Sequence, residues 1–423
     1  MDANRRGRAA PAWLIRLAVV TVLVGVGGGV AGLLVSMSLT AIEHVAYGYS
    51  QGSFLDGVLG ADPWRRVAAL AVAGLVGGAG WWALRRFGRA VVSVEASVAG
   101  GRMPGLPTLL NAALQIVVVG LGASIGREVA PRELGALVAG WLSDRAHISA
   151  RERRILVACG AGAGLAAVYN VPLSGAIFTI EVLLAEISFA VAVPALITAA
   201  VATIVARLVV PDAPLYSLPP MQLSETLFVW SLLAGPLMGL AAMGFVWLVR
   251  GAARLRPRTW LIVCIMPVVF AGVGLLAIPF PAVLGNGKAL GEVAFAGAAS
   301  IGLLAVLAVT KVVATTATIG AGAAGGTLTP SLAVGAALGG ALGGLWSLWW
   351  PGSPIAGFAF VAAAAFLASS MRAPFTALVL LIEFTGQGPA LLVPAMLAIA
   401  GSIAVSRLVS RSPLVARRNL PAP

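Results

Sequence analysis

The sequence predicts an all-α polytopic membrane protein with two inverted-topology repeats of tilted and broken helices. Three observations predict this class. Hydrophobic residues fill 60% of the 423 positions and charged residues only 10%, which leaves too little polar surface for a water-soluble fold. Apolar runs of membrane-spanning length recur along the chain, and two distant segments share one residue pattern. The 52 glycines and 25 prolines are spread throughout, which indicates short, broken or closely packed helices.

The first apolar run and the basic residues together predict how the chain lies in the membrane. This run begins near Trp13, lacks a small-residue cleavage site and continues past Leu39, so it is a membrane helix and not a removed signal peptide. Most basic residues form five clusters that can all lie on the cytoplasmic side. The clusters occupy residues 5–16, 85–89, 145–154, 250–258 and 407–418. We therefore expect an integral, multi-pass protein of the cell membrane with both termini cytoplasmic. Arg65 and Arg66 do not fit this rule.

The formal net charge of +13 points to the membrane surface and not to nucleic acid. Its basic clusters stand beside apolar spans, where they set topology and contact anionic lipid. His44 and His147 are too few and too scattered for a metal site, and nothing in the sequence predicts a bound cofactor. Cys159 and Cys264 lie in apolar segments, where thiols pack as small hydrophobes, so no disulfide framework is indicated.

An internal repeat links the two halves of the chain. The segments "GLAAVYNVPLSGAIFTIEV" and "FLASSMRAPFTALVLLIEF" each place a proline nine residues before a glutamate, at Pro172 and Glu181 and at Pro374 and Glu383. Similar glycine-rich breaks ending in proline precede both segments. The shared spacing indicates that the two halves follow one template.

The polar, proline-rich stretch "VPDAPLYSLPPMQ" is the natural joint between the halves. It divides the chain into a first membrane repeat at residues 1–210, a linker at 211–222 and a second membrane repeat at 223–423. With both termini inside and the joint outside, each half crosses the membrane an odd net number of times. The halves are then inverted relative to one another, an arrangement that puts broken helices near the membrane midplane.

Three glycine-rich breaks are candidates for anion binding: "AGGRMPG" at residues 99–105, "IGREVAP" at 125–131 and "AGGTLTP" at 324–330. A glycine-rich stretch that leads into a helix leaves backbone N–H groups available and presents the positive end of the helix dipole. Helix N-termini that converge in the membrane can replace part of the hydration shell of an anion. Such a site binds a permeating ion well enough to admit it and weakly enough to release it.

Glu128, in the second of these breaks, has two interpretations. A carboxylate at a helix N-terminus in an apolar setting can be a plain cap, with Arg127 as its counter-charge. It can also compete with an anion for the same N–H groups, so that it blocks the site when ionised and opens it when protonated or swung away. Glu133, about a turn and a half further along, either lines a helix interface or supplies a second acid near the pathway.

These motifs, in this order, resemble those of the CLC family of chloride channels and proton-coupled chloride antiporters. "GREVAP" is similar to the family's GREGP motif, "GGTLTP" to GxFxP and, more weakly, "GGRMPG" to GSGIP. "GAGAGLAAVYNVPLSGAIFTIE" is the closest match, and the resemblance covers nearly the whole chain. It implies a homodimer with one separate pore per subunit for chloride or other small anions. The chain ends soon after its last apolar run, so we expect no cytoplasmic regulatory domain.

The resemblance also implies roles for individual residues. By position, Glu128 is similar to the gating glutamate of the family. Backbone N–H groups of Thr327 and Leu328 would line the central anion site, and those of Gly101 and Arg102 the inner one. The expected anion-binding positions are Gly100, Gly101, Arg102, Gly126, Arg127, Val129, Gly326, Thr327, Leu328 and Val415.

Several departures from the family pattern bear on mechanism. The serine that coordinates the central anion in the family falls at Gly101, and a tyrosine near the C-terminus falls at Val415, so no side-chain hydroxyl would narrow the inner vestibule. The second glutamate, which takes protons from the cytoplasm in coupled members, falls at Val182, and valine cannot carry a proton. Val129 stands where the motif has glycine, and Leu328 where it has phenylalanine.

We therefore expect voltage- or pH-gated transport of chloride or another small anion, with Val182 favouring the uncoupled channel. Three alternatives stay open: a proton-coupled chloride antiporter, a fluoride-selective relative and, more remotely, a carrier for organic solutes. An intramembrane hydrolase is not indicated, because Ser174 has no evident histidine base: His44 belongs to the first long helix and His147 to a polar cluster. The chain is not expected to be an enzyme.

Overall fold

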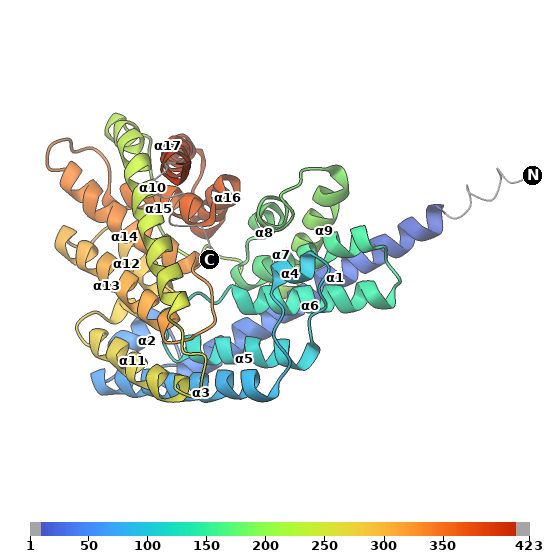
Figure 1. Cartoon of the computed structure of the whole chain (residues 1–423). Coiled ribbons are helices and arrows are strands. Elements are labelled where there is room, and N and C mark those ends of the chain that lie inside the picture. The colour runs from blue at the N-terminus through green and yellow to red at the C-terminus, as the bar shows by residue number, and fades with distance from the viewer. Residues whose placement is uncertain (1–9, 412–423) are drawn as a thin grey trace, which may run out of the picture. The chain divides into compact units, whose positions relative to one another are not determined.

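The computed structural model describes residues 10–411, and its elements are helices, as the sequence predicts (Figure 1). Within these residues, extended backbone pairs in an isolated antiparallel bridge between Gly126 and Gly326. The chain forms two compact units, each assembled from separate stretches of sequence. The first unit contains residues 10–38, 83–116 and 128–213, and the second contains residues 39–82, 117–127 and 214–411. The predicted all-α class is confirmed.

The first unit is a helical bundle around α7 (Ala150–Tyr169). Its elements are the first part of α1 (Ala10–Tyr47), α4 (Val94–Val98), most of α5 (Gly105–Gly120), α6 (Val129–Arg145), α7, α8 (Pro172–Phe178), the π-helix η1 (Thr179–Leu184) and α9 (Phe189–Ala206). The N-cap residue of α7 is Ser149, whose hydroxyl accepts a hydrogen bond from the N–H of Glu152. From Ile155 onward every residue of α7 is buried, so this helix is the core of the unit.

Helices α6 and α7 lie side by side because glycine faces glycine or backbone along their contact (Figure 1). A Cβ atom on Gly135 would lie 2.0 Å from the carbonyl oxygen of Gly160. A Cβ atom on Gly164 would lie 2.1 Å from the carbonyl oxygen of Pro131, in the first turn of α6. Since no larger residue fits, the two backbones approach as closely as small residues allow in membrane helix pairs. This contact fixes the start of α6 against the second half of α7.

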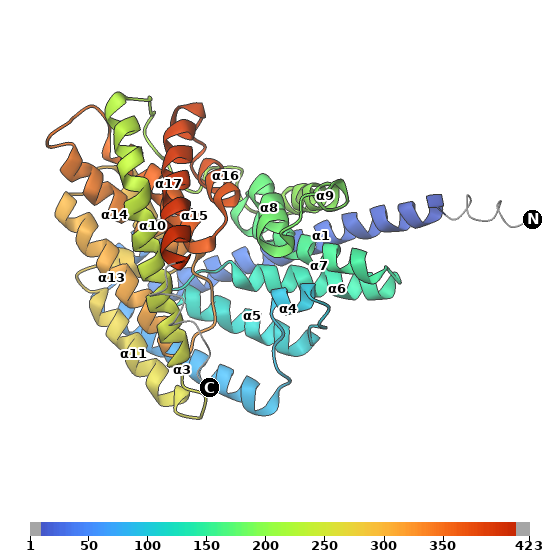
Figure 2. The same ribbon diagram turned by 45° about the horizontal axis from the view of Figure 1, so that its top comes forward.

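The second unit contains the remaining helices. They are the end of α1, α2 (Phe54–Gly60), most of α3 (Pro63–Phe87), α10 (Glu225–Arg254), α11 (Ile262–Leu276), η2 (Pro281–Val283), α12 (Lys288–Ala296), α13 (Ile301–Gly320), α14 (Leu328–Trp346), α15 (Ile355–Met371), α16 (Pro374–Thr385), η3 (Pro389–Leu391) and α17 (Leu392–Arg411). Helix α15 is buried over most of its length, with α10, α14 and α17 packed around it (Figure 2). Gly235 and Gly239 of α10 meet the backbone of α17 directly.

Corresponding segments of the two halves have the same local structure. Helix α7 ends at Asn170, which adopts the left-handed conformation at φ 57°, and α15 ends at Arg372, also left-handed at φ 57°. One residue of similar backbone conformation follows in each case, Val171 at φ −128° and Ala373 at φ −133°, and then Pro172 opens α8 and Pro374 opens α16. A proline at the first helical position loses no intrahelical hydrogen bond. The shared sequence pattern therefore corresponds to one helix–turn–helix design used twice.

Arg65 and Arg66, which do not fit the charge rule for topology, have a structural role in the second unit. Arg65 donates from Nε and Nη2 to the carbonyl oxygens of Ala46 and Val45, at the end of α1. Arg66 is buried and donates to carbonyl oxygens that follow the ends of α2 and α11 or lie in their last turns. Carbonyl groups at helix C-termini lack intrahelical donors and carry partial negative charge. Both arginines therefore neutralise helix ends and are not free basic residues that report topology.

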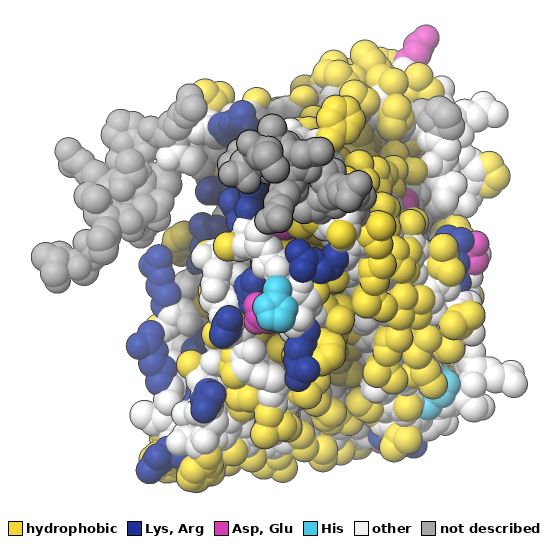
Figure 3. Space-filling view, turned by 90° about the vertical axis from the view of Figure 1, so that its right-hand side faces the viewer, with side chains coloured by type: hydrophobic (Ala, Val, Ile, Leu, Met, Phe, Trp, Pro, Cys, Tyr) yellow, Lys and Arg dark blue, Asp and Glu magenta, His cyan; other side chains and the backbone are white. Residues whose placement is uncertain are grey.

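Seven helices in the described part of the chain are long and apolar enough to cross a membrane. They are α1, α3, α9, α10, α13, α14 and α17. One face of the molecule carries many Lys and Arg side chains next to a broad apolar surface (Figure 3). A surface of this kind suits a protein that spans a bilayer next to anionic head groups.

Candidate functional site

Gly126 and Gly326, from two of the three predicted breaks, pair with each other inside the second unit. The N–H of Gly126 donates to the carbonyl oxygen of Gly326 at 2.7 Å, and the N–H of Gly326 donates to that of Gly126 at 3.1 Å. Four residues before each paired glycine the chain turns at a second glycine, Gly122 at φ 104° and Gly322 at φ 112°. Only glycine adopts such φ values without strain. The two breaks are thus matching loops joined back to back.

A helix N-terminus follows each of these loops. Glu128 is the N-cap residue of α6 in the first unit, and Thr327 is the N-cap residue of α14 in the second. Each helix has a proline in its first turn, Pro131 in α6 and Pro330 in α14. The missing N–H has no intrahelical acceptor at that point, so the proline is tolerated. Both helix starts carry the positive end of the helix dipole, which is the feature that attracts an anion.

Helix α13 supports the first loop within the second unit. Ser124 Oγ and Thr315 Oγ1 share a hydrogen bond of 3.1 Å. One turn earlier, the fully buried Lys311 donates from Nζ to the carbonyl oxygens of Val283 at 2.8 Å and Gly285 at 2.7 Å. The N–H of Gly285 in turn donates to the carbonyl oxygen of the loop glycine 122 at 2.8 Å. A buried lysine in an apolar helix was not anticipated, although charge inside a membrane helix is itself a signal of function.

Glu128 is buried, with only 2% of its surface exposed, and its side chain makes no capping hydrogen bond to α6. The cap interpretation of this carboxylate is therefore not what the structure shows. Instead, the hydroxyl of Tyr169, at the end of α7, donates a hydrogen bond to Glu128 Oε2 at 3.4 Å. Tyr169 is part of the repeated sequence segment, but its hydroxyl was not recognised as a partner because nothing in the sequence places the end of α7 beside Glu128.

Glu133 lies at the interface between α5 and α6 in the first unit. The side-chain amide of Asn111 donates to both of its carboxylate oxygens, at 3.1 Å and 2.9 Å. The amide of Gln115 donates to Oε2 at 3.0 Å. All three side chains are buried. Two amides on successive turns of one apolar helix therefore satisfy a buried carboxyl group, as buried polar groups require.

The inner glycine-rich stretch, residues 100–102, lies in the first unit between α4 and α5. Gly100 turns the chain at φ 111°, and the N–H of Gly101 donates to the carbonyl oxygen of Ala96 at 2.9 Å. The N–H that we expected to face an anion thus closes the end of α4. Arg102 is exposed, and its Nε lies 3.7 Å from Asp144 Oδ2.

The other predicted positions belong to both units. Val182 lies in the π-helix η1 and is 36% exposed. Arg127 is half-buried, as is Val129 in the first turn of α6. Val415 lies outside the residues that the structure describes. The structure therefore brings Gly126 and Gly326 together within the second unit.

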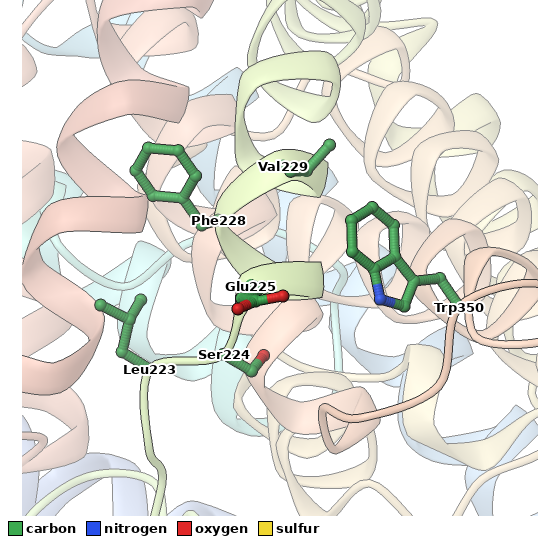
Figure 4. Close-up of a pocket in the computed structure, with 6 residues that line it drawn as sticks. All are labelled: Leu223, Ser224, Glu225, Phe228, Val229 and Trp350. Atoms are coloured by element: carbon green, nitrogen blue, oxygen red, sulfur yellow. The ribbon is translucent and has the colours of Figure 1, made fainter.

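A cavity of about 500 Å³ opens elsewhere in the second unit, at the start of α10 (Figure 4). It is lined by Leu223, Ser224, Glu225, Phe228, Val229 and Trp350. Apolar side chains form most of this lining, and the hydroxyl of Ser224 caps α10 by accepting from the N–H of Leu227. None of the predicted anion-binding residues lines this cavity, so it has no part in the site.

Two matched glycine loops, each leading into a helix N-terminus in a multi-pass protein, are features that suit anion transport. The sequence profile of the family described as voltage gated chloride channel matches residues 67–407. The chain therefore belongs to the CLC family, as its motifs predict, and is a CLC-type anion transport protein. Proteins of this family are channels or transporters and not enzymes.

Relatives with assigned names support the same family. The protein named voltage-gated ClC-type chloride channel ClcB from Escherichia coli is 31% identical over 401 residues, which cover 88% of this chain and 92% of that protein. The protein of the same name from Citrobacter koseri is 27% identical over 390 residues, with the same coverage.

Solved structures share the fold. A slow cyanobacterial Cl⁻/H⁺ antiporter has a TM-score of 0.81 at 20% identity, covering 95% of this chain and 97% of the other. A CLC-type fluoride/proton antiporter has a TM-score of 0.73 at 19% identity, covering 93% of this chain and 98% of the other. At these sequence identities the structural similarity establishes the fold. It does not identify the ion that this chain transports.

Proposed function

We propose that this protein conducts chloride passively across the cell membrane and that protonation of Glu128 opens its pathway. The observation that carries the proposal is the position of this carboxylate. It is buried at the N-terminus of α6, does not cap that helix and follows the loop whose Gly126 pairs with Gly326. An ionised carboxylate there competes with chloride for the same positive potential, and a protonated one does not.

The uncoupled form is supported by Val182. Coupled exchange needs a proton carrier on the cytoplasmic side, and the resemblance puts that carrier at a position where this chain has valine. The relatives from Escherichia coli and Citrobacter koseri are likewise named chloride channels. In this proposal backbone groups of Gly126, Thr327 and Leu328 contact the ion.

The proposal extends to assembly and topology. The functional unit is a homodimer with one pathway per subunit, and both termini are cytoplasmic. The chain divides into repeats at residues 1–210 and 223–423, joined by the linker at 211–222. The helix–turn–helix design that recurs at Asn170 and at Arg372 supports this division, since a repeat should preserve backbone geometry as well as sequence.

The test is the pH dependence of chloride efflux from liposomes that contain the purified protein. We expect Glu128→Gln to conduct at acidic and at mildly alkaline pH alike, because glutamine mimics the protonated acid. Glu225→Gln is the matched control: it also neutralises a glutamate at the start of a helix, and it should keep the pH dependence of the unmodified protein. If Glu128→Gln retains that dependence, Glu128 is not the gate.

Proton-coupled exchange is a second candidate, and one observation favours it. Glu133 is a buried acid on the same helix as Glu128, and the amides of Asn111 and Gln115 hold it in place. A buried carboxyl group of this kind can carry a proton that Val182 cannot. Recording extravesicular pH together with chloride efflux separates the candidates. Proton movement opposite to chloride at a fixed ratio, abolished in Glu133→Gln, supports exchange, and chloride flux without proton movement supports the channel.

Replacing chloride by fluoride in the same assay tests the fluoride-selective alternative.

A further inference from the structure

Tyr169 is the aromatic residue whose hydroxyl contacts the carboxylate of Glu128. The two side chains come from different helices of the first unit, α7 and α6, and are 41 positions apart in sequence. The hydroxyl donates and the carboxylate oxygen Oε2 accepts, at 3.4 Å. Tyr169 is 5% exposed and Glu128 is 2% exposed, so little water competes for this bond. An O–H donor interacts more strongly with an ionised carboxylate than with a neutral carboxyl group.

The backbone just after Tyr169 is held in a defined conformation. Asn170 ends α7 in the left-handed region, which asparagine tolerates better than most residues. Its side chain bridges two partners: Asn170 Nδ2 donates to Asp212 Oδ1 at 3.1 Å, and Arg207 Nε donates to Asn170 Oδ1 at 2.9 Å. Arg207 and Asp212 also form an ion pair of 2.8 Å. The end of α7 is therefore tied to the end of α9.

The backbone just after Glu128 is held against the same helix. Gly164 allows the carbonyl of Pro131 to touch α7, five positions before Tyr169 and three positions after Glu128. Because both sides of the contact are backbone atoms, the distance between the two helices is fixed. The bond between Tyr169 and Glu128 thus joins two anchored points and is not a chance approach of mobile side chains.

The other charged groups near Glu128 on α6 are engaged elsewhere. Arg132 Nη2 pairs with Glu95 Oε1 at 3.1 Å, and its guanidinium carbon lies 4.6 Å from the ring centre of Phe178. Glu133 is held by amides of α5. Arg127 precedes Glu128 in the chain, and the charged residues 151–154 of α7 lie at the far end of that helix. From α7, the phenol of Tyr169 contacts Glu128.

We propose that Tyr169 is a positioning residue that latches the ionised Glu128 carboxylate in its blocking position. This inference rests on the proposed gating role of Glu128. When Glu128 takes up a proton, its oxygen becomes a weaker acceptor, the latch loosens and the side chain is released. Tyr169 therefore sets how acidic the medium must be before the pathway opens.

Tyr169→Phe tests the latch, because it keeps the ring and removes only the hydroxyl. Without the donor, the ionised form of Glu128 is less favoured, so we expect the midpoint of the pH-activation curve for chloride efflux to move upward by about one pH unit. Tyr216→Phe, which removes the hydroxyl of another buried tyrosine in the second unit, should leave the midpoint unchanged. A midpoint of Tyr169→Phe equal to that of the unmodified protein overturns the proposal.

A second variant separates failure of the latch from failure of the gate. In the Glu128→Gln background, Tyr169→Phe should have no further effect on flux at any pH, because no ionised carboxylate remains to be held. An equal effect in both backgrounds means that the hydroxyl acts on the pathway directly, which refutes the latch. If Glu128→Gln itself leaves the pH dependence intact, the gating role of Glu128 is refuted. The proposed role of Tyr169 is then refuted as well, because it depends on that gating role.

Discussion

Replacing Gly164 by alanine tests whether the close contact of α6 and α7 positions the gating carboxylate. A Cβ atom at Gly164 would lie 2.1 Å from the carbonyl oxygen of Pro131, where ordinary van der Waals contact begins at 3.4 Å. The obstacle is backbone, so the two helices must separate by about an ångström at the first turn of α6. Overpacking of this kind destabilises the folded state by about 1–3 kcal/mol. The better helix propensity of alanine offsets roughly 1 kcal/mol of this. The net destabilisation is therefore about 1 kcal/mol and at most about 2 kcal/mol.

The assay is thermal unfolding of the purified protein in detergent, with Gly244→Ala as the matched control. Gly244 lies in α10, and a Cβ atom there meets nothing within 4 Å, so alanine should be neutral or stabilise by up to about 1 kcal/mol. Gly164→Ala should also alter the pH dependence of chloride efflux, because it moves Glu128 away from Tyr169. Equal melting temperatures for the two variants, with unchanged efflux, would refute the packing argument.

Three further predictions concern single side chains. Asn170→Ala should destabilise the protein by about 1–2 kcal/mol in the same melting assay, and Asn170→Gly by less, because glycine keeps the left-handed conformation. Arg66→Met should lower the melting temperature far more than Arg86→Met, because buried carbonyl groups at two helix ends lose their donor while Arg86 is exposed. The backbone N–H and hydroxyl of Ser53 donate to Asp56 and hold the pKa of that carboxyl below its usual value of 3.8. The cap of α2 should therefore persist above that value and be lost as the pH falls through the lowered pKa, which amide hydrogen exchange of α2 can follow.

The sequence was sufficient to predict the fold class and the local motif geometry. Composition alone places the chain in a membrane, and glycine-rich breaks that end in proline predict interrupted helices. The repeated spacing from Pro172 and Pro374 predicted that the two halves follow one template, and the structure has equivalent turns at Asn170 and Arg372. These features depend on local chemistry, which a single sequence contains.

Contacts between distant segments were not predictable in the same way. The bond from Tyr169 to Glu128 depends on how closely α6 approaches α7, which a sequence of small residues permits but does not specify. The amides around Glu133 could have been found, since polar residues on an apolar helix need partners, but their target could not. Arg66 was counted as an exception to a topology rule because a buried arginine and a cytoplasmic one look alike in sequence.

The two hydrogen bonds between Gly126 and Gly326 involve main-chain atoms alone, so they do not depend on the identity of any side chain. Every amino acid except proline has the N–H and C=O groups that these hydrogen bonds need. Departures from the family motif nearby, such as Val129 for glycine or Leu328 for phenylalanine, therefore change the side chains around the loops and leave the main-chain hydrogen bonds between the loops in place. In this chain the main-chain pairing is therefore present although the side chains around it differ from the family motif.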